Sequence, residues 1–473
     1  MEDTKILILN LPGPVLKSGS RWFNKTKSGA ASMRYYPYPW FMGYATSLLK
    51  KNGFTVLFKD AVALEWSEDA TRKLVEGFVP DYIICDPTTV SINEDKMFLD
   101  SLNSDIVKIA VGNMATNFPL KCLDFCDYSV VGEYEFSLLE FFRTEGKKLP
   151  KNFVSKKKTK FERPELVQDL DEFPFPERKD TPIDYYNEPS CYGRNVVMVS
   201  SRGCRLKCSF CIVEDIYGKH VYRVRSPKNV VDEIEELQKN YEFDEIYFDD
   251  DNMVASKDHI DGICKEIIKR GVKVKWLCMG DGLVTDETLD LLKRAGCVTY
   301  KWGLEHLDAD VLKAIPKPLR RERQLELIKL CRKLGIRSYV NLIVGLPGST
   351  KEKDIKMLED VIKESPDLLQ LAIASPLKGT AFYRSAVENN WLIKDKVVDV
   401  TGEGVVSYPN YSSEKITEVF REGWKMWYRH VLLRKPTTLW FFFSSEVRRN
   451  GFVPTSLKAF SYLVKLIGKN NEK

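Results

Sequence analysis

The sequence predicts an α/β protein with two successive parallel sheets and a helical C-terminal segment. Two stretches of the chain alternate short apolar runs, typical of buried strands, with runs that have helical spacing. Such alternation indicates parallel sheets whose strands are connected by helices. The stretch after residue 396 lacks this alternation and is rich in aromatic and basic residues. A length of 473 residues is sufficient for several domains.

The first segment, residues 1–146, begins with the strand-like run KILILN and the loop residues Pro12-Gly13-Pro14. Residues 40–51 have helical spacing and end at Asn52-Gly53, a helix stop signal. Further strand-like runs follow at residues 55–58, 82–85, 108–111 and 128–131. We expect a doubly wound, Rossmann-like sheet, whose ligands lie beyond the carboxyl ends of the strands. Those ends carry Thr88, Gly112, Asn113, Gly132 and Glu133.

The second segment, residues 191–395, follows a charged and proline-rich stretch, residues 147–190, that we interpret as a solvated linker. It contains six strand-like runs with helical patterns between them. These predict a partial (β/α)6 barrel of the TIM type, in which active-site residues gather at the C-terminal strand ends. The runs are residues 196–200, 245–249, 274–278, 300–304, 338–344 and 368–374.

The third segment, residues 396–473, is predicted to be mostly helical. Apolar and basic residues mixed on a helix can rest on an anionic membrane surface. The alternative is that the aromatic side chains cover the open edge of the preceding barrel. The residues concerned are Trp424, Trp427, Tyr428, Trp440, Phe441, Phe442 and Phe443, with Arg429, Arg434, Lys435, Arg448 and Arg449 among them.

Composition excludes several classes of protein. Hydrophobic residues make up 44% of the chain and charged residues 29%, the balance of a folded protein. The net charge of +5 is small and acids interleave with the bases, so we expect no nucleic-acid partner. The N-terminus lacks a signal-peptide pattern, and no apolar run approaches the roughly 20 residues of a membrane span. We expect a cytoplasmic protein, in peripheral contact with a membrane if the third segment binds lipid.

Cys204, Cys208 and Cys211 are spaced C-x3-C-x2-C directly after the first strand-like run of the second segment. Three thiolates on one loop can bind three irons of a cubane cluster and leave the fourth iron open. A zinc site would normally need a fourth ligand, and the nearest candidate is His220. The position at a strand end favours the cluster. The odd total of 11 cysteines fits thiols and metal ligands better than a disulfide framework.

The stretch RGCRLKCSFC, with Phe210 before the last cysteine, resembles the signature of the radical S-adenosylmethionine (SAM) superfamily. The resemblance implies a [4Fe-4S] cluster whose open iron binds the amine and carboxylate of SAM. It also implies an electron donor such as flavodoxin or ferredoxin. Reduction then yields a 5′-deoxyadenosyl radical, which takes hydrogen from an unactivated carbon, chemistry that no side chain performs alone.

Three later strand ends resemble elements of the same family. Asp250, Asp251 and Asn252 resemble an acidic motif that lies near the cofactor, although a helix cap or an acidic turn would have the same composition. Glu305 stands where related enzymes bind the cofactor hydroxyls, and a carboxylate can accept both. Gly345 begins a turn that resembles one passing close to adenine. A plain β-turn is the alternative there.

Four short motifs occur in order along the first two segments: Arg34-Tyr35-Tyr36-Pro37-x-Pro39, Gly112-Asn113-x-x-Thr116, Gly132-Glu133 and Arg225-Ser226-Pro227. Together they resemble the cobalamin-dependent branch, which includes methylases and the anaerobic magnesium-protoporphyrin cyclase. The resemblance implies cobalamin, held by the strand ends that carry Thr88, Gly112, Asn113, Gly132 and Glu133. The D-x-H-x-x-G motif is absent and no histidine precedes His220, so the first segment has no histidine for the lower face of the cobalt. The alternative is a domain that keeps the fold without the cofactor.

The resulting hypothesis is a methyltransferase that acts on an unactivated carbon of a small molecule. A lipid-like or large apolar substrate would accompany the membrane interpretation of the third segment. A radical cyclase or rearrangement enzyme without net methyl transfer has the same layout. A non-catalytic cobalamin or redox sensor is the alternative from a different class.

Overall fold

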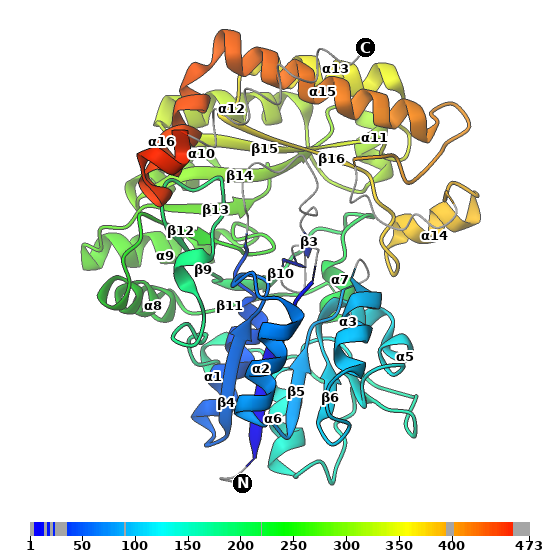
Figure 1. The fold of residues 1–473 in the computed structure, drawn as a ribbon. Helices are drawn as coiled ribbons and strands as arrows, with labels where there is room; N and C mark the ends of the chain where they lie inside the picture. Colours follow the sequence, from blue (N-terminus) through cyan, green and yellow to red (C-terminus); the bar gives the residue numbers. More distant parts are fainter. Residues whose placement is uncertain are drawn as a thin grey trace.

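The computed structural model describes residues 4–13, 17–18, 22–23, 36–88, 91–218, 220–393 and 402–456. Within these residues the chain forms two six-stranded sheets, one in each half of the molecule (Figure 1). A long C-terminal helix lies along the outside of the second half (Figure 1). Residues 457–473, the end of the segment predicted to be helical, lie outside the described residues.

The first sheet has the order β4-β1-β5-β6-β7-β8, with parallel pairing up to β7 and an antiparallel edge strand β8. Alternate residues of β1 face opposite layers: Ile6 and Ile8 pack with α1 and α6, whereas Leu7 and Leu9 pack with α2 to α5. Helices on both faces confirm the predicted doubly wound fold. The strands are β1 (Lys5–Asn10), β4 (Thr55–Asp60), β5 (Tyr82–Cys85), β6 (Val107–Ala110), β7 (Tyr128–Val130) and β8 (Phe153–Val154). The helices are α1 (Trp40–Lys51), α2 (Glu68–Phe78), α3 (Ile92–Asp100), α4 (Gly112–Asn117), α5 (Pro119–Cys122) and α6 (Glu135–Arg143). A separate two-stranded pair joins β2 (Lys17–Ser18) to β3 (Trp22–Phe23).

Residues 147–190 are more than the solvated linker expected from composition. They contain β8, which extends the first sheet, and the 3-10 turns Leu170–Glu172 and Ile183–Tyr185. Leu170 and Phe173 are buried in the core of the first domain. Apolar side chains spaced irregularly among charges hid this packing from sequence reasoning. The domain limits themselves stay a prediction.

The second sheet has the order β16-β15-β14-β13-β12-β9, parallel throughout, as the predicted partial barrel requires. Along β14, Tyr300, Trp302 and Leu304 pack against the outer helices, so Lys301 and Gly303 project to the inner face. The strands are β9 (Asn195–Met198), β12 (Glu245–Phe248), β13 (Trp276–Gly280), β14 (Cys297–Glu305), β15 (Arg337–Val344) and β16 (Leu368–Ile373). The helices are α8 (Pro227–Asn240), α9 (Lys257–Arg270), α10 (Asp286–Arg294), α11 (Ala309–Ala314), α12 (Arg321–Leu334) and α13 (Lys351–Glu364).

A hairpin interrupts the barrel between β9 and α8. Its antiparallel strands are β10 (Ser201–Gly203) and β11 (Tyr222–Val224), and the short helix α7 (Val213–Tyr217) lies between them. The three cysteines occupy the loop from β10 to α7. Short polar strands without alternation gave no sequence signal for this hairpin.

The C-terminal helices are α14 (Ala381–Glu388), α15 (Ser413–Arg434) and α16 (Pro436–Asn450). Helix α15 packs against α13 and β16, so it covers the open edge of the half-barrel (Figure 1). Trp427 on α15 is buried in the barrel core, as the edge-covering interpretation expects. Trp440 on α16 is instead 68% exposed. Among the described residues, no helix has the length and apolar character needed to cross a membrane.

The two sheets share a hydrophobic core. Val197, Val199, Tyr247 and Leu277 of the barrel lie in the same buried cluster as Trp40 and other residues of the first domain. The first domain therefore closes the inner face of the barrel near β9, β12 and β13. This arrangement brings the first domain to the cysteine loop.

Candidate active site

A backbone hydrogen bond holds the residue that precedes the cysteine loop. Gly203, the last residue of β10, has a φ of +93° and donates its N–H to Asp251 Oδ2 at 2.8 Å. The Cys211 N–H donates to the Cys208 carbonyl at 3.1 Å, which makes the end of the loop a turn. All three thiols are free and their residues are partly exposed, so the loop can present them to a ligand.

The surroundings of the thiols bear on what they could bind. Burial raises the pKa of Cys208 and Cys211 to about 12, and the Lys317 ammonium opposes this rise at Cys208. Binding of metal would therefore release protons. In the described part of the chain, no three His, Cys, Asp or Glu side chains converge on one ion. Thiolates of a cubane bind separate irons and need not converge on one ion. His220, the candidate fourth ligand of a zinc site, instead has its Nε2 2.9 Å from Glu214 Oε2.

The far end of the loop is anchored on the barrel. Phe210 is partly buried and packs against the barrel core. The Ser209 carbonyl accepts the N–H of Phe382, at the start of α14, at 2.8 Å. The sequence predicted a cofactor contact for Phe210. In the structure the Phe210 ring packs against the barrel core and so holds the end of the cysteine loop to the barrel.

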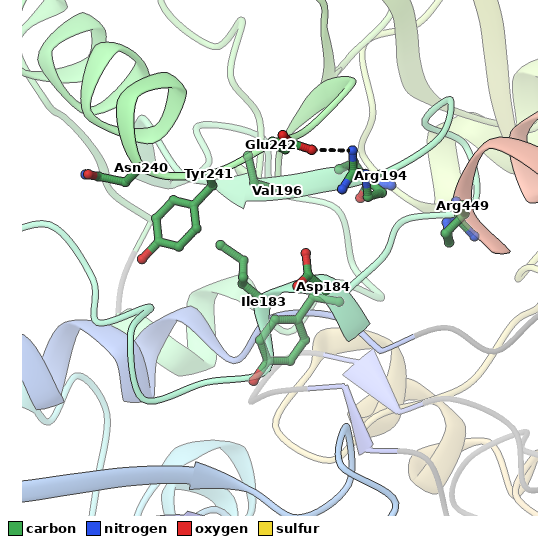
Figure 2. Close-up of a pocket in the computed structure, with 10 residues that line it drawn as sticks. Ile183, Asp184, Arg194, Val196, Asn240, Tyr241, Glu242 and Arg449 are labelled. Atoms are coloured by element: carbon green, nitrogen blue, oxygen red, sulfur yellow. Dashed lines mark hydrogen bonds and ion pairs between the residues drawn. The ribbon is translucent and has the colours of Figure 1, made fainter. Parts of the chain in front are cut away.

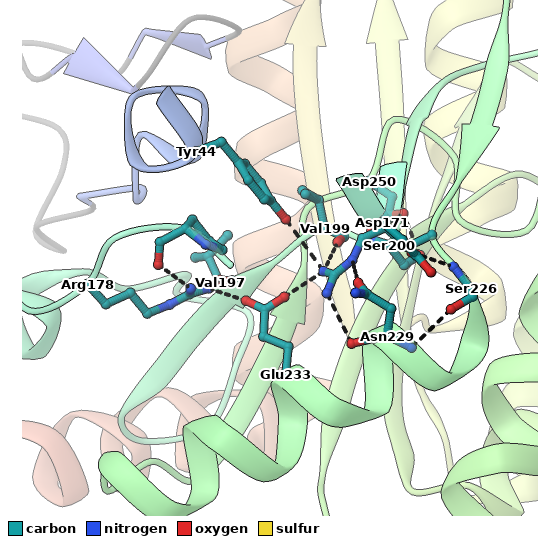
Figure 3. Close-up of polar contacts among 12 residues, drawn as sticks. Tyr44, Asp171, Arg178, Val197, Val199, Ser200, Ser226, Asn229, Glu233 and Asp250 are labelled. Atoms are coloured by element: carbon teal, nitrogen blue, oxygen red, sulfur yellow. Dashed lines mark hydrogen bonds and ion pairs between the residues drawn. The ribbon is translucent and has the colours of Figure 1, made fainter. Parts of the chain in front are cut away.

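Asp250, predicted at the cofactor, lies under the loop and holds its base. It is fully buried after β12 and accepts hydrogen bonds from Ser200 N–H at 3.1 Å, Ser200 Oγ at 2.7 Å and Ser201 Oγ at 2.5 Å. Figure 3 shows Asp250 beside Ser200 at the end of β9. Burial raises the pKa of this carboxyl to about 6. The contacts support the loop from below.

Asp251 and Asn252 lie closer to the thiols. Asp251 accepts the Gly203 N–H and the Tyr217 hydroxyl, the latter at 3.3 Å, so it ties the loop to α7. The amide of Asn252 donates to Cys204 Sγ at 3.6 Å. A hydrogen bond to a sulfur ligand tunes a cluster, so Asn252 is placed to influence one.

A network centred on Arg225 fixes the end of β9 (Figure 3). Arg225 donates to the Val199 carbonyl at 2.8 Å, to Glu233 Oε2 at 2.5 Å and to Asn229 Oδ1 at 2.7 Å. Arg178, from the stretch expected to be a linker, pairs with the other Glu233 oxygen at 3.0 Å. The strand that leads to the cysteine loop is therefore held from two directions.

Glu305 forms a buried ion pair with Lys317. Lys317 Nζ lies 2.6 Å from Glu305 Oε1 and 2.7 Å from the Gly303 carbonyl. Glu305 has a φ of +59°, unusual for a residue other than glycine. A Cβ on Gly303 would lie 2.0 Å from Glu305 Oε1, so glycine makes room for the pair. Lys317 also acts on the Cys208 thiol, which links this strand end to the cysteine loop.

Gly345 begins a buried turn with a φ of +74°. Its N–H donates to Asp354 Oδ2 at 2.8 Å, and its carbonyl accepts the Tyr408 hydroxyl at 2.8 Å. Asp354 also contacts His306 Nε2 at 3.1 Å, while the Asp308 N–H donates to His306 Nδ1 at 2.9 Å. Both nitrogens of this buried histidine thus have protein partners, which gives His306 a structural role.

The residues predicted for cobalamin lie at the carboxyl edge of the first sheet: Thr88 after β5, Gly112 and Asn113 at the start of α4, and Gly132 and Glu133 after β7. The Thr116 hydroxyl joins two of these ends, because it donates to the Gly112 carbonyl at 2.8 Å and accepts the Gly132 N–H at 3.0 Å. A Cβ on Gly132 would lie 3.3 Å from the carbonyl of Ile216 in α7. This edge therefore faces the helix that follows the cysteine loop.

Glu133 connects the two domains through buried arginines. Its Oε1 lies 2.7 Å from both Arg202 and Arg223, and its Oε2 lies 3.0 Å from Arg223. Arg202 also pairs with Glu135 at 2.8 Å. The Arg202 guanidinium lies 4.3 to 5.2 Å from the ring centroids of Trp40, Phe41, Tyr44 and Phe173. Both oxygens of Glu133 face arginines, where sequence reasoning expected a cofactor.

Sequence reasoning missed Arg202 and Lys317. Arg202 stands two residues before Cys204, and that proximity is a usable signal. Lys317 lies in a loop after α11 without a motif, so its approach to Glu305 could not be foreseen.

Two cavities lie away from the cysteine loop. One, of about 280 Å³, is lined by Ile183, Arg194, Tyr241, Arg449 and their neighbours at the amino-terminal end of β9 (Figure 2). The other, of about 690 Å³, lies among α11, α12 and α13. None of the predicted site residues lines either cavity, so neither belongs to the candidate active site.

Comparison with known proteins identifies the family of the segment that carries the three cysteines. Residues 198–361 match the model of the radical SAM superfamily. The chain is 25% identical over 406 residues to an uncharacterized methyltransferase of Pyrococcus horikoshii, covering 82% of this chain and 87% of the relative. It is 26% identical over 455 residues to cytidylyl-2-hydroxyethylphosphonate methyltransferase of Streptomyces wedmorensis, covering 81% and 84%.

A solved structure shares the fold over nearly the whole chain. The cobalamin-dependent SAM radical enzyme OxsB, with aqua-cobalamin and SAM bound, superposes with a TM-score of 0.70 at 14% identity. The match covers 99% of this chain and 76% of that one. The likeness concerns the arrangement of both domains.

Proposed function

Residues 198–361 of this chain form a radical SAM domain, and on this premise we propose that the protein is a cobalamin-dependent methyltransferase acting on an unactivated carbon of a small molecule. One observation carries the proposal: α7, the helix that follows the cysteine loop, lies against the carboxyl edge of the Rossmann-like first sheet. Two methyltransferase relatives and a fold shared with a cobalamin-dependent radical enzyme support it.

Cys204, Cys208 and Cys211 would hold the cluster. Three partly exposed thiols on one loop fit a cubane with an open iron. When bound, the cluster and SAM supply the one-electron chemistry that activates a C–H bond, and cobalamin supplies the methyl group. Asp250 and Asp251 hold the backbone at the start of the loop, and Asn252 would tune the sulfur of Cys204. A reductant such as flavodoxin or ferredoxin would deliver the electron.

Glu305 and Lys317 would bind SAM. The Glu305 carboxylate is positioned at the strand end by Lys317, and a carboxylate accepts hydrogen bonds from two neighbouring ribose hydroxyls. The Lys317 ammonium also offsets the negative charge of nearby thiolates. Gly345, on the next strand end, contributes a turn whose backbone is held by Asp354 and Tyr408.

Cobalamin would lie at the edge formed by Thr88, Gly112, Asn113 and Gly132. Small residues and backbone groups are available there, and α7 of the barrel lies opposite. No histidine precedes His220, so the first domain would leave the lower face of the cobalt without an imidazole ligand. Glu133 would act indirectly, through the arginines that join the domains.

The test is anaerobic purification with cobalamin supplied, followed by iron and sulfide analysis, absorption spectra and incubation with SAM and reductant. We expect bound cluster, bound corrinoid and reductive cleavage of SAM. With a substrate, a product heavier by one CH2 group supports methyl transfer, whereas an unchanged carbon count supports a cyclase or rearrangement enzyme. Absence of SAM cleavage by the cluster-loaded protein would contradict an enzyme and favour the sensor alternative.

We also propose that the α15–α16 corner contacts an anionic membrane surface. Leu433 and Trp440 are 71% and 68% exposed, and Trp440 joins Phe443 and Phe452 in a row of rings with centroids 6.0 and 6.3 Å apart. Arg434, between these positions, is exposed and positively charged. Exposed apolar groups beside basic ones suit an anionic headgroup layer.

Vesicle sedimentation tests this contact. The full chain should sediment with phosphatidylglycerol vesicles at low salt and remain in solution with phosphatidylcholine vesicles. Leu433→Ser with Trp440→Ser should abolish sedimentation, while the exposed Val79→Ser on the first domain should not change it. Equal sedimentation of the double variant and of Val79→Ser would refute this surface.

A further inference from the structure

Six positively charged side chains of the described chain are buried: Arg178, Arg202, Arg223, Arg225, Lys301 and Lys317. Five of them contact a carboxylate at 3.0 Å or less. Lys301, only 8% exposed, is the exception, because its ammonium makes no ion pair or hydrogen bond with any described residue. A buried ammonium that forms no ion pair or hydrogen bond is unusual, so its retention requires an explanation.

The ammonium of Lys301 lies inside the half-barrel. Tyr300 and Trp302 on either side face the outer helices, which directs Lys301 inward. Its nitrogen lies 4.7 Å from the ring centroid of Tyr339 and 5.8 Å from that of Tyr247. Aromatic faces attract a cation but do not replace a counter-ion.

Along the barrel axis, Lys301 lies between the amino-terminal strand ends, which an ion pair fills, and the carboxyl strand ends, where Glu305 lies. Towards the amino-terminal end, Arg337 pairs with Glu245 at 2.8 Å and donates to Thr299 at 2.7 Å. Towards the other end, Glu305 follows about 13 Å further along β14 at 3.3 Å per residue. The unpaired ammonium therefore lies beneath the edge where SAM is proposed to bind.

Charges near Lys301 limit what could pair with it. Burial is the largest influence on the pKa of Lys301 and lowers it, but Tyr339, Glu188 and Asp249 raise it above its ordinary value. The group stays protonated. Because Glu188 and Asp249 already contribute negative charge, the site favours a ligand with one negative charge over a dianion.

We propose that Lys301 binds a carboxylate group of the substrate inside the barrel, an inference that rests on the proposed function. A single ammonium matches a single negative charge, and the tyrosine rings would flank the chain that carries the carboxylate. The depth of Lys301 beneath the SAM edge would leave the remainder of the substrate pointing towards that edge. No described carboxylate forms an ion pair with this ammonium, and Glu188 and Asp249 act on it only through space.

The binding test uses acetate, propionate and benzoate, each paired with its neutral amide, and inorganic phosphate. Saturation-transfer NMR on the full-length, cluster-loaded protein measures their affinities. We expect at least one carboxylate to bind, its amide to bind more weakly, and Lys301→Met to weaken the carboxylate at least tenfold. Lys301→Arg should retain part of the affinity. Failure of every carboxylate to bind the wild type, equal binding by Lys301→Met, or tighter binding of phosphate would each overturn the proposal.

Thermal unfolding separates a binding role from a structural one. Because Lys301→Met breaks no ion pair or hydrogen bond, it should change the midpoint little. Lys317→Met is the matched control: it leaves Glu305 buried without its partner and should lower the midpoint. A Lys301→Met midpoint as low as that of Lys317→Met would assign Lys301 to the fold. Measurements on the wild type separate this site from the proposed function. A wild type without cluster or SAM cleavage would contradict the function, whereas a cluster-loaded, SAM-cleaving wild type that binds no carboxylate would contradict this site alone.

Discussion

Arg202 of the barrel and Glu135 of the first domain form a buried ion pair, with Nη2 and Oε1 2.8 Å apart. Arg202 stands two residues before Cys204, so the cysteine loop begins at the contact between the domains. Glu133 reinforces the contact through Arg202 and Arg223. The position of the loop relative to the first sheet is therefore set by charges that neither domain could bury alone.

Arg202→Met should destabilise the protein by about 3–5 kcal/mol, because it leaves Glu135 buried without its ion-pair partner and Glu133 with Arg223 alone. Anaerobic urea unfolding measures the change. Arg194→Met is the control, since Arg194 pairs with the exposed Glu242 and should cost at most about 1 kcal/mol. A similar loss of unfolding free energy in the two variants would show that the inter-domain ion pair stabilises the protein no more than an exposed one does.

Replacing Cys204, Cys208 and Cys211 together by Ala should remove the cluster and leave the protein folded, because these partly exposed thiols contribute little to the core. Iron and sulfide content, with circular dichroism as the check on folding, provides the measurement. Cys264→Ala is the control: it removes a buried thiol of α9, and the protein should keep the iron content of the wild type. Iron content equal to wild type in the triple variant would contradict the ligand assignment.

Glu305→Gln should weaken SAM binding about tenfold or more, the equivalent of a charge-assisted hydrogen bond of roughly 1.5–3 kcal/mol. Equilibrium binding to the cluster-loaded protein measures the dissociation constant. Because Gln leaves Lys317 without its counter-charge, the double variant Glu305→Gln, Lys317→Met shows whether the loss comes from the carboxylate itself. An unchanged constant in the single variant would return Glu305 to a structural role.

His259 should make the protein less stable in acid. It is buried, and burial lowers its pKa from the ordinary 6.5 to about 4. Its Nε2 lies 3.0 Å from Ser200 Oγ, which itself donates to Asp250, so we infer that Nε2 carries the proton and donates. The unfolded chain binds the second proton more readily, so this stability is present above pH 6.5 and is lost as pH falls towards 4. The loss is roughly 3 kcal/mol at 1.36 kcal/mol per pKa unit.

The difference in unfolding free energy between wild type and His259→Gln isolates this contribution across pH 7 to 4. The comparison is necessary because Asp60 and Asp250, whose pKa values burial raises to about 6, act in the opposite direction. A carboxyl with a raised pKa takes up its proton more readily in the folded state, so stability rises as pH falls through 6. A pH-independent difference would exclude His259 as an acid-sensitive group.

Sequence patterns were sufficient where the information is local. The apolar run at Lys5–Asn10 and the helical spacing at Trp40–Lys51 match β1 and α1, because period and helix stop signals act within a few residues. The C-x3-C-x2-C spacing places three thiols on one loop wherever the loop lies. Alternation of strands and helices was likewise sufficient for two parallel sheets.

Tertiary structure alone decided which partner each charged group meets. Glu133 meets Arg202 across 69 positions, and Asp250 meets Ser200 across 50. Within residues 147–190, expected as a linker, Leu170 and Phe173 pack into a cluster that contains side chains from both sheets, a contact that local sequence does not encode. The sequence by itself determined the elements and the chemistry of the cysteine loop. Packing of the two domains determined the electrostatic surroundings of that loop, because ion pairing and desolvation depend on groups distant along the chain.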